Sequence, residues 1–255
     1  MKIKKMLLAA FLTAALMGGN SLFAQSNSIL NLGLNIPQGS FGSKTNTCAL
    51  LDPNSENGGA NLGANLGLKF IADTKAKGLG IMFTIDGMYN GLQKDLKIKD
   101  YLHADIPEIA GLDAKIKNPS YINMPILLGL NYTYNFTNMI GIYAEGGAGV
   151  NVRFILPCKL SANGSILGVN TEYTYELHYT PKASFAFEFG GGILISKAIT
   201  LGVNYYYLGS ATVSGHADSY LKLPTSSQPT SSTIDFANKD LSTSMLVIRL
   251  GICLL

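Results

Sequence analysis

The stretch IYAEGGAGVNVRF, residues 142–154, alternates apolar and polar side chains. One parity carries Ile, Ala, Val and Phe, whereas the other carries Glu145, Asn151 and Arg153 together with two glycines. A period of two predicts a β-strand with one apolar face and one polar face. Such a strand fits a soluble sandwich, whose polar face meets water. It also fits a transmembrane barrel, whose apolar face meets lipid and whose polar face lines the lumen.

The composition of the whole chain favours the barrel. Charged residues make up 14% of the 255 residues, against roughly 25% in ordinary globular domains. After the N-terminal segment no run of 18 apolar residues occurs, so no spanning helix is predicted. An apolar chain without such a helix is typical of a transmembrane β-barrel, which satisfies every backbone group through strand pairing. A soluble exported β-sandwich remains the alternative fold.

The N-terminus has the form of a secretory signal peptide. Three lysines within the first five residues precede an apolar run at residues 6–17, and SLFAQ follows at residues 21–25. The run is shorter than the ~20 residues of a spanning helix, so we expect a signal peptide at residues 1–24, cleaved between Ala24 and Gln25. The same lysines account for the net charge of +3. The remaining domain, residues 25–255, is therefore expected to be near neutral, and no basic cluster predicts nucleic-acid binding.

Eight segments share the alternation of residues 142–154, and each is about as long as the 9–11 tilted residues that cross a bilayer. They are residues 28–36, 61–70, 79–89, 121–136, 142–154, 184–196, 199–213 and 244–255. Short connections alternate with long ones at residues 38–60, 92–119, 157–181 and 215–241. This pattern predicts an eight-stranded antiparallel up-and-down transmembrane β-barrel with short periplasmic turns and long extracellular loops. Weak alternation at residues 165–179 allows either a hairpin above the membrane or a ten-stranded barrel.

Charged side chains within these segments fall on the polar parity, which faces the lumen. They are Lys69, Asp86, Glu145, Arg153, Glu188 and Arg249. An unpaired charge in a narrow lumen is costly, so three acids and three bases predict an ionic network across it. An eight-stranded barrel is filled by its own side chains, and we therefore interpret the network as a structural plug. The alternative is that these charges guide ions through a narrow pore.

The predicted loops contain cysteines and histidines that are candidate site residues. Cys48 and Cys158 lie in the first and third long loops, where an oxidising location would permit a disulfide across the barrel mouth. His103, His178 and His216 lie in or beside long loops, but their spacing matches no metal-ligand or HExxH pattern. We therefore expect solvated histidines, no catalytic residues, no bound metal and no cofactor.

The chain resembles the small outer-membrane β-barrel proteins of the OmpA-like and PorT-like superfamily. The resemblance is carried by LFAQ at residues 22–25, YAEGGAGVNVRF at 143–154, FEFGGGILIS at 187–196 and LVIRLGICLL at 246–255. It implies a location in the bacterial outer membrane, contact with its lipids and insertion by the barrel assembly machinery. Members include anchors, adhesins, porin-like proteins and secretion components, so the fold leaves the function open.

Taken together, these patterns favour a non-enzymatic outer-membrane barrel with a plugged lumen, whose extracellular loops serve structural, adhesive or partner-binding roles. A narrow transport pore that uses the lumen charges is the first alternative. An enzyme with a site at the loop rim is the second, and it would require a histidine within reach of a serine or a carboxylate.

Overall fold

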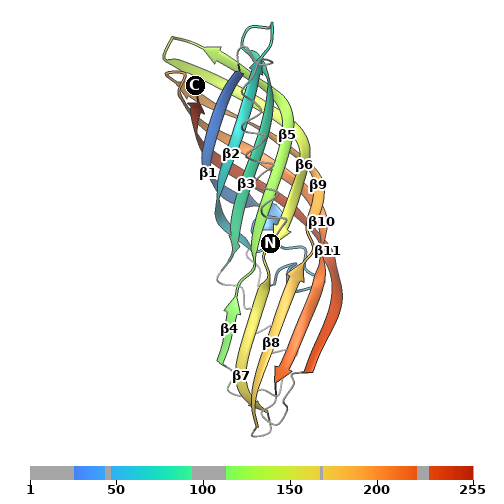
Figure 1. Ribbon diagram of the computed structural model, residues 1–255. Helices are drawn as coiled ribbons and strands as arrows, with labels where there is room; N and C mark the ends of the chain where they lie inside the picture. Colours follow the sequence, from blue (N-terminus) through green and yellow to red (C-terminus); the bar gives the residue numbers. More distant parts are fainter. Residues whose placement is uncertain (1–25, 44–46, 94–112, 167–168, 223–229, 255) are drawn as a thin grey trace.

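The computed structural model describes residues 26–43, 47–93, 113–166, 169–222 and 230–254, and these residues form an all-β protein (Figure 1). Apart from the short 3-10 helix η1 (Gly39–Gly42), every regular element is a strand. The strands are β1 (Ser26–Gln38), β2 (Ala60–Asp73), β3 (Leu79–Leu92), β4 (Asp113–Lys117), β5 (Ser120–Asn135), β6 (Ile140–Ile155), β7 (Cys158–Ile166), β8 (Val169–Tyr179), β9 (Lys182–Ile195), β10 (Ile199–Lys222) and β11 (Thr230–Leu254). The predicted signal peptide lies outside the described residues. Among those residues, no helix is long and apolar enough to cross a membrane.

Eight strands close into an antiparallel ring in the order β11-β1-β2-β3-β5-β6-β9-β10, and β10 pairs with β11 to complete it. At the seam, Leu32 of β1 lies opposite Leu250 of β11 on one side and Leu66 of β2 on the other. The predicted eight-stranded up-and-down barrel is confirmed. The ten-stranded alternative is wrong, because β7 pairs with β8, and β8 pairs with the far half of β10, so that neither strand joins the ring.

Beyond one end of the ring, β4, β7 and β8 join the far halves of β10 and β11 in an open sheet that we call the extension (Figure 1). The expectation of a long loop at residues 215–241 was wrong, because β10 and β11 are 24 and 25 residues long and continue out of the ring. At about 3.3 Å per residue each spans roughly 80 Å, far more than a bilayer requires. One face of the extension carries a buried cluster that includes Leu177 and Ala217.

Large apolar side chains cover the outside of the ring. Leu128 on β5 is 63% exposed, and every ring strand contributes residues of this kind. They include Leu34, Leu66, Ile81, Leu130, Ile142, Val150, Phe185, Phe189, Leu201, Val203, Ile248 and Ile252. The intervening positions point inward and are buried, among them Asn31, Asn65 and Asn123. This inverted pattern, apolar outside and polar inside, is the one that a lipid environment stabilises.

The described parts of the connection between β1 and β2, residues 39–43 and 47–59, fold into the lumen at the end that faces the extension. Phe41, Cys48 and Leu50 from this connection are fully buried. They form one cluster with inward-facing ring residues, including Met88, Tyr121, Leu127, Leu208, Leu241 and Met245. Phe41 packs edge-on against Tyr121, with 5.0 Å between ring centroids, and the Tyr121 hydroxyl donates a hydrogen bond of 2.6 Å to the carbonyl of Gly58. We call this cluster the upper plug, where upper means toward the extension, which Figure 1 draws at the bottom.

Glycines provide space for bulky and charged side chains inside the small ring. Gly67 lies opposite Asp86 across the β2–β3 pair, and a Cβ at Gly67 would overlap the Asp86 carboxylate. Similarly, a Cβ at Gly147 would lie 3.1 Å from Cε of Met82, a fully buried side chain. The glycines on the polar parity therefore face the large groups that fill the lumen.

Substitution of Leu128 by Arg tests whether the outer belt faces lipid. An arginine near the midplane costs about 2–4 kcal/mol, so we expect Leu128→Arg to lower the urea concentration at which the refolded barrel loses its heat-modifiable gel mobility. The control is Ser231→Arg, at an exposed residue of the extension, which should leave that midpoint unchanged. Equal loss in both variants would contradict a lipid-facing belt.

Candidate functional site

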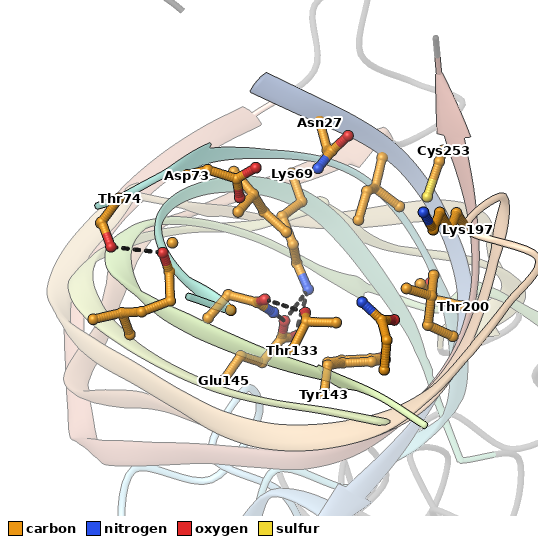
Figure 2. Close-up of a pocket in the computed structure, with 18 of the residues that line it drawn as sticks. Asn27, Lys69, Asp73, Thr74, Thr133, Tyr143, Glu145, Lys197, Thr200 and Cys253 are labelled. Carbon is orange, nitrogen blue, oxygen red and sulfur yellow. Dashed lines mark hydrogen bonds and ion pairs between the residues drawn. The ribbon is translucent and has the colours of Figure 1, made fainter. Parts of the chain in front are cut away.

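An ion pair crosses the lumen between strands that are not neighbours. Lys69 on β2 reaches Glu145 on β6 and donates hydrogen bonds to both carboxylate oxygens (Figure 2). The two side chains are 4% and 0% exposed. Glu145 also accepts hydrogen bonds from the amides of Asn131, at 3.1 Å, and Asn204, at 2.8 Å. The carboxylate is therefore surrounded by donors, which a buried charge requires.

A second group of charges lies beside the first. Nη2 of Arg249 on β11 lies 2.9 Å from Oδ2 of Asp86 on β3, and Nη1 lies 3.8 Å from Oε2 of Glu188 on β9. Tyr206 joins this group, since it accepts a hydrogen bond from Arg249 and donates one of 3.1 Å to Asp86. Its ring also lies under the guanidinium, 4.9 Å from the centroid, an arrangement that favours a cation.

Asn204 connects the two groups, because its amide nitrogen donates to Glu145 and, at 3.4 Å, to Glu188. Five of the six predicted lumen charges, each on a different strand, thus belong to one buried network. It contains two cations and three carboxylates, and we call it the ionic layer. Asn131, Asn204 and Tyr206 were not predicted as members, although they lie on the same inward parity as the charges and that parity would have identified them.

Arg153 does not belong to the ionic layer, which differs from the expectation of a single network. It lies eight residues beyond Glu145 on β6, about 26 Å along the strand at 3.3 Å per residue. Its guanidinium is buried and donates a hydrogen bond of 3.1 Å to the carbonyl of Leu241. Arg153 forms no ion pair with a carboxylate of the described residues. The alternation of side chains predicted that Arg153 faces the lumen, but alternation alone does not give its position along the barrel axis.

A cavity of about 420 Å3 occupies the lumen between the ionic layer and the short turns (Figure 2). Residues of the β2–β3 turn, including Thr74 and Lys77, line its outer end. Lys69, Tyr143 and Glu145 line its inner end. The half of the lumen toward the short turns is therefore hollow and polar, whereas the other half is filled by the ionic layer and the upper plug.

Both candidate disulfide cysteines are buried, unbonded thiols. Cys48 belongs to the upper plug, Cys158 begins β7, and Leu51 packs against the clusters that contain them. Burial raises the pKa of Cys48 to about 11, and burial together with the neighbouring Cys48 raises the pKa of Cys158 to about 11. The disulfide stays a prediction.

His178 and His216 lie on strands and not in the loops where histidines were expected. His178 on β8 and His216 on β10 lie directly opposite each other in the extension, and their rings stack. The sequence did not reveal this pairing, because it depends on the register between β8 and β10, and residues 215–241 were expected to form a loop. His103 lies outside the described residues.

The closed ring, the apolar outer belt and the charged interior together define a small transmembrane β-barrel with a β-sheet extension at one end. No protein-family model matches the chain, and no curated protein matches it. Among solved structures, the chain is similar to Ail, the attachment invasion locus protein of Yersinia pestis, at 10% identity and a TM-score of 0.38, covering 90% of this chain and 97% of Ail.

Two further solved structures show a comparable similarity. One is a major outer membrane protein from Thermus thermophilus, at 8% identity and a TM-score of 0.38, covering 90% of this chain and 100% of that chain. The other is the outer membrane protein OprG from Pseudomonas aeruginosa, at 13% identity and a TM-score of 0.37, covering 90% and 95%. The assignment to the barrel class rests on the strand register and the outer belt described above.

Removal of the central cation tests the ionic layer. Arg249→Gln leaves Asp86 and Glu188 without their guanidinium, and breaking a buried pair in this way costs about 3–5 kcal/mol. We expect a correspondingly lower free energy of unfolding in detergent micelles. The control Lys239→Gln breaks an exposed pair with Glu56, 3.0 Å apart, and should cost about 0–1 kcal/mol. Similar losses in both variants would show that the layer is not a structural network.

Proposed function

We propose that the protein is a non-enzymatic barrel of the bacterial outer membrane, with a closed lumen and an extracellular extension that serves a structural, adhesive or partner-binding role. The observation that carries this proposal is the filling of the lumen at two successive levels. A solute from the short-turn end would meet the ionic layer first and the upper plug second.

The two levels resist passage for different physical reasons. In the ionic layer, moving Lys69 away from Glu145 would leave two charges unpaired in a buried site, which costs several kcal/mol. In the upper plug, Phe41 and Leu50 are fully buried, and their exposure would cost roughly 1.5–3 kcal/mol each. A steady water path would have to open both levels together, which supports a closed lumen.

The extension supports a role outside the membrane. It is an open sheet with β4 at one edge and the far half of β11 at the other. Edge strands present unpaired backbone groups, to which an extended peptide of a partner can add as a further strand. Ile234 on the β11 edge is 65% exposed and offers such a partner an apolar contact. An edge of this kind requires no catalytic chemistry.

The histidines meet one requirement of a rim enzyme, because carboxylates lie within reach of them, but the rest of their surroundings favours a non-enzymatic role. A rim hydrolase would require a nucleophile beside its base. His178 and His216 instead face the carboxylates of Glu176 and Asp218. The nearby hydroxyl of Thr233 donates to Asp218 and not to a histidine. A base held beside acids, with the neighbouring Thr233 hydroxyl bonded to Asp218, does not resemble a base that activates a hydroxyl nucleophile.

A narrow pore is the second candidate function, and the polar cavity at the short-turn end favours it. That cavity already leads from the turns to Lys69 and Glu145, so a pore would require only a path through the ionic layer and the upper plug. In this alternative, the lumen charges would select the ions that pass.

Conductance of the purified chain in a planar bilayer distinguishes the two functions. We expect heat-modifiable gel mobility, which reports a folded barrel, without discrete conductance steps. Arg153→Gln and Glu145→Gln should likewise give no steps unless they unfold the barrel, which gel mobility would reveal. Regular steps in the parent protein that disappear or change selectivity in Glu145→Gln would establish the pore and contradict the closed lumen.

We further propose that Cys48 and Cys158 form a disulfide after export, because both thiols lie by Leu51 in the same buried region. The bond would join the upper plug to the start of the extension. It would also stabilise the closed lumen, since it restricts the unfolded chain.

Protein isolated from the membrane under alkylating conditions should show a faster-migrating form on a non-reducing gel, absent in Cys48→Ser and retained in Cys253→Ser. After reduction, alkylation of the folded protein should be slow at pH 8 and accelerate as the pH approaches 11, because burial raises the pKa of both thiols to about 11 and the thiolate is the nucleophile. Absence of the faster-migrating form in the parent protein would contradict the disulfide.

A further inference from the structure

Four titratable side chains share one face of the extension. His178 and Glu176 are two residues apart on β8, and His216 and Asp218 are two residues apart on β10. In the antiparallel pairing, His178 lies opposite His216 and Glu176 lies opposite Asp218. The opposite face of the same strands carries Leu177 and Ala217, which are buried. The four polar side chains therefore form a compact square on the solvent side, built on a continuous hydrogen-bonded sheet.

The potential ligand atoms converge on one point. Oδ2 of Asp218 lies 3.7 Å from Nε2 of His178 and 3.9 Å from Nε2 of His216. If each of the three residues contributes one ligand atom, these three atoms lie within 4.8 Å of one another. The imidazole rings are nearly parallel, with centroids 5.0 Å apart and an interplanar angle of 19°, and both Nε2 atoms approach the same carboxylate oxygen.

These separations are close to those of a tetrahedral metal site. With metal–nitrogen and metal–oxygen distances of about 2.0–2.2 Å, neighbouring ligand atoms lie about 3.3–3.5 Å apart. Small rotations of the three side chains would shorten the distances between the ligand atoms to these values. His178 and His216 are 36% and 47% exposed, so these rotations disturb no packed core and an ion can enter from solvent.

The two carboxylates are already oriented by neighbouring strands. Oδ1 of Asp218 accepts a hydrogen bond of 2.7 Å from the Thr233 hydroxyl on β11, which leaves Oδ2 facing the histidines. Lys159 on β7 holds Oε1 of Glu176 at 2.5 Å, which leaves Oε2 3.5 Å from Nε2 of His178. Such outer contacts orient the ligands of known metal sites.

We propose that His178, His216 and Asp218 bind a divalent transition metal ion of the zinc type, with Glu176 or water as the fourth ligand. Two imidazole nitrogens favour zinc, copper or nickel over calcium and magnesium, which prefer oxygen ligands. The ion would connect β8 to β10 outside the membrane, and its binding does not depend on whether the lumen is closed. A cluster in which histidines only pair with acids is the competing interpretation.

Titration calorimetry with zinc chloride tests the site on the refolded full chain in detergent, with any affinity tag removed and with metal stripped by chelator. We expect one ion per chain. Affinity should fall at least tenfold in His216→Ala and in Asp218→Asn, and binding should be lost in the double variant His178→Ala/His216→Ala. Thr233→Val, which removes the orienting hydroxyl, should weaken binding up to about tenfold.

Asp240→Asn is the matched control. Asp240 also accepts a hydrogen bond across the β10–β11 pair, from Thr212 at 2.6 Å, but it has no histidine beside it in the register. This variant should bind zinc like the parent. All the substitutions lie on the extension, so we expect the ring to fold in every variant. Unchanged heat-modifiable gel mobility checks this.

Either of two outcomes overturns the proposal. One is the absence of saturable zinc binding in the parent chain, which would leave the cluster as a set of ion pairs. The other is zinc binding of equal affinity in the double histidine variant, which would place the ion elsewhere on the molecule.

Discussion

In hydrocarbon, a backbone N–H or C=O without a partner costs several kcal/mol, and no water is present to supply one. The closed ring meets this constraint, because each of its eight strands is paired on both sides and β11 returns to β1. The other main features of the barrel follow from closure. The outward parity must be apolar, the inward parity must accommodate charge, and the narrow lumen forces those charges into contact with one another.

The barrel could be predicted from the sequence because lipid imposes a period of two on every ring strand. For the extension, a hairpin above the membrane was one alternative at residues 165–179, and β7 does pair with β8 outside the ring. The far halves of β10 and β11 could not be predicted, because the side chains of residues 215–241 hardly indicate the backbone pairing that sets their register. The upper plug was missed for a related reason. Phe41 and Leu50 lie in a connection without periodicity, and only the folded path of residues 39–59 shows that they turn inward.

The candidate sites show the same limit at the level of single residues. Alternation along the strands placed all six charges inside the lumen, and five of them meet in the ionic layer. Counting eight residues from Glu145 along the same strand would have separated Arg153 from this layer, whereas its hydrogen-bond partner depends on distances across the ring. The histidine cluster depends on the register of β8 against β10, which no local pattern encodes.

The seam between β1 and β11 also has a consequence for how the molecule assembles. It pairs Ser28 with Leu254, so it joins segments that are almost as distant in sequence as the described chain allows. Contacts of such high sequence separation form late and slowly, whereas β1, β2 and the connection between them are a local hairpin. Phe41 and Leu50 of the upper plug can therefore pack against strands of the sheet before the barrel is closed. Pairing of β1 with β11 then closes the ring around them.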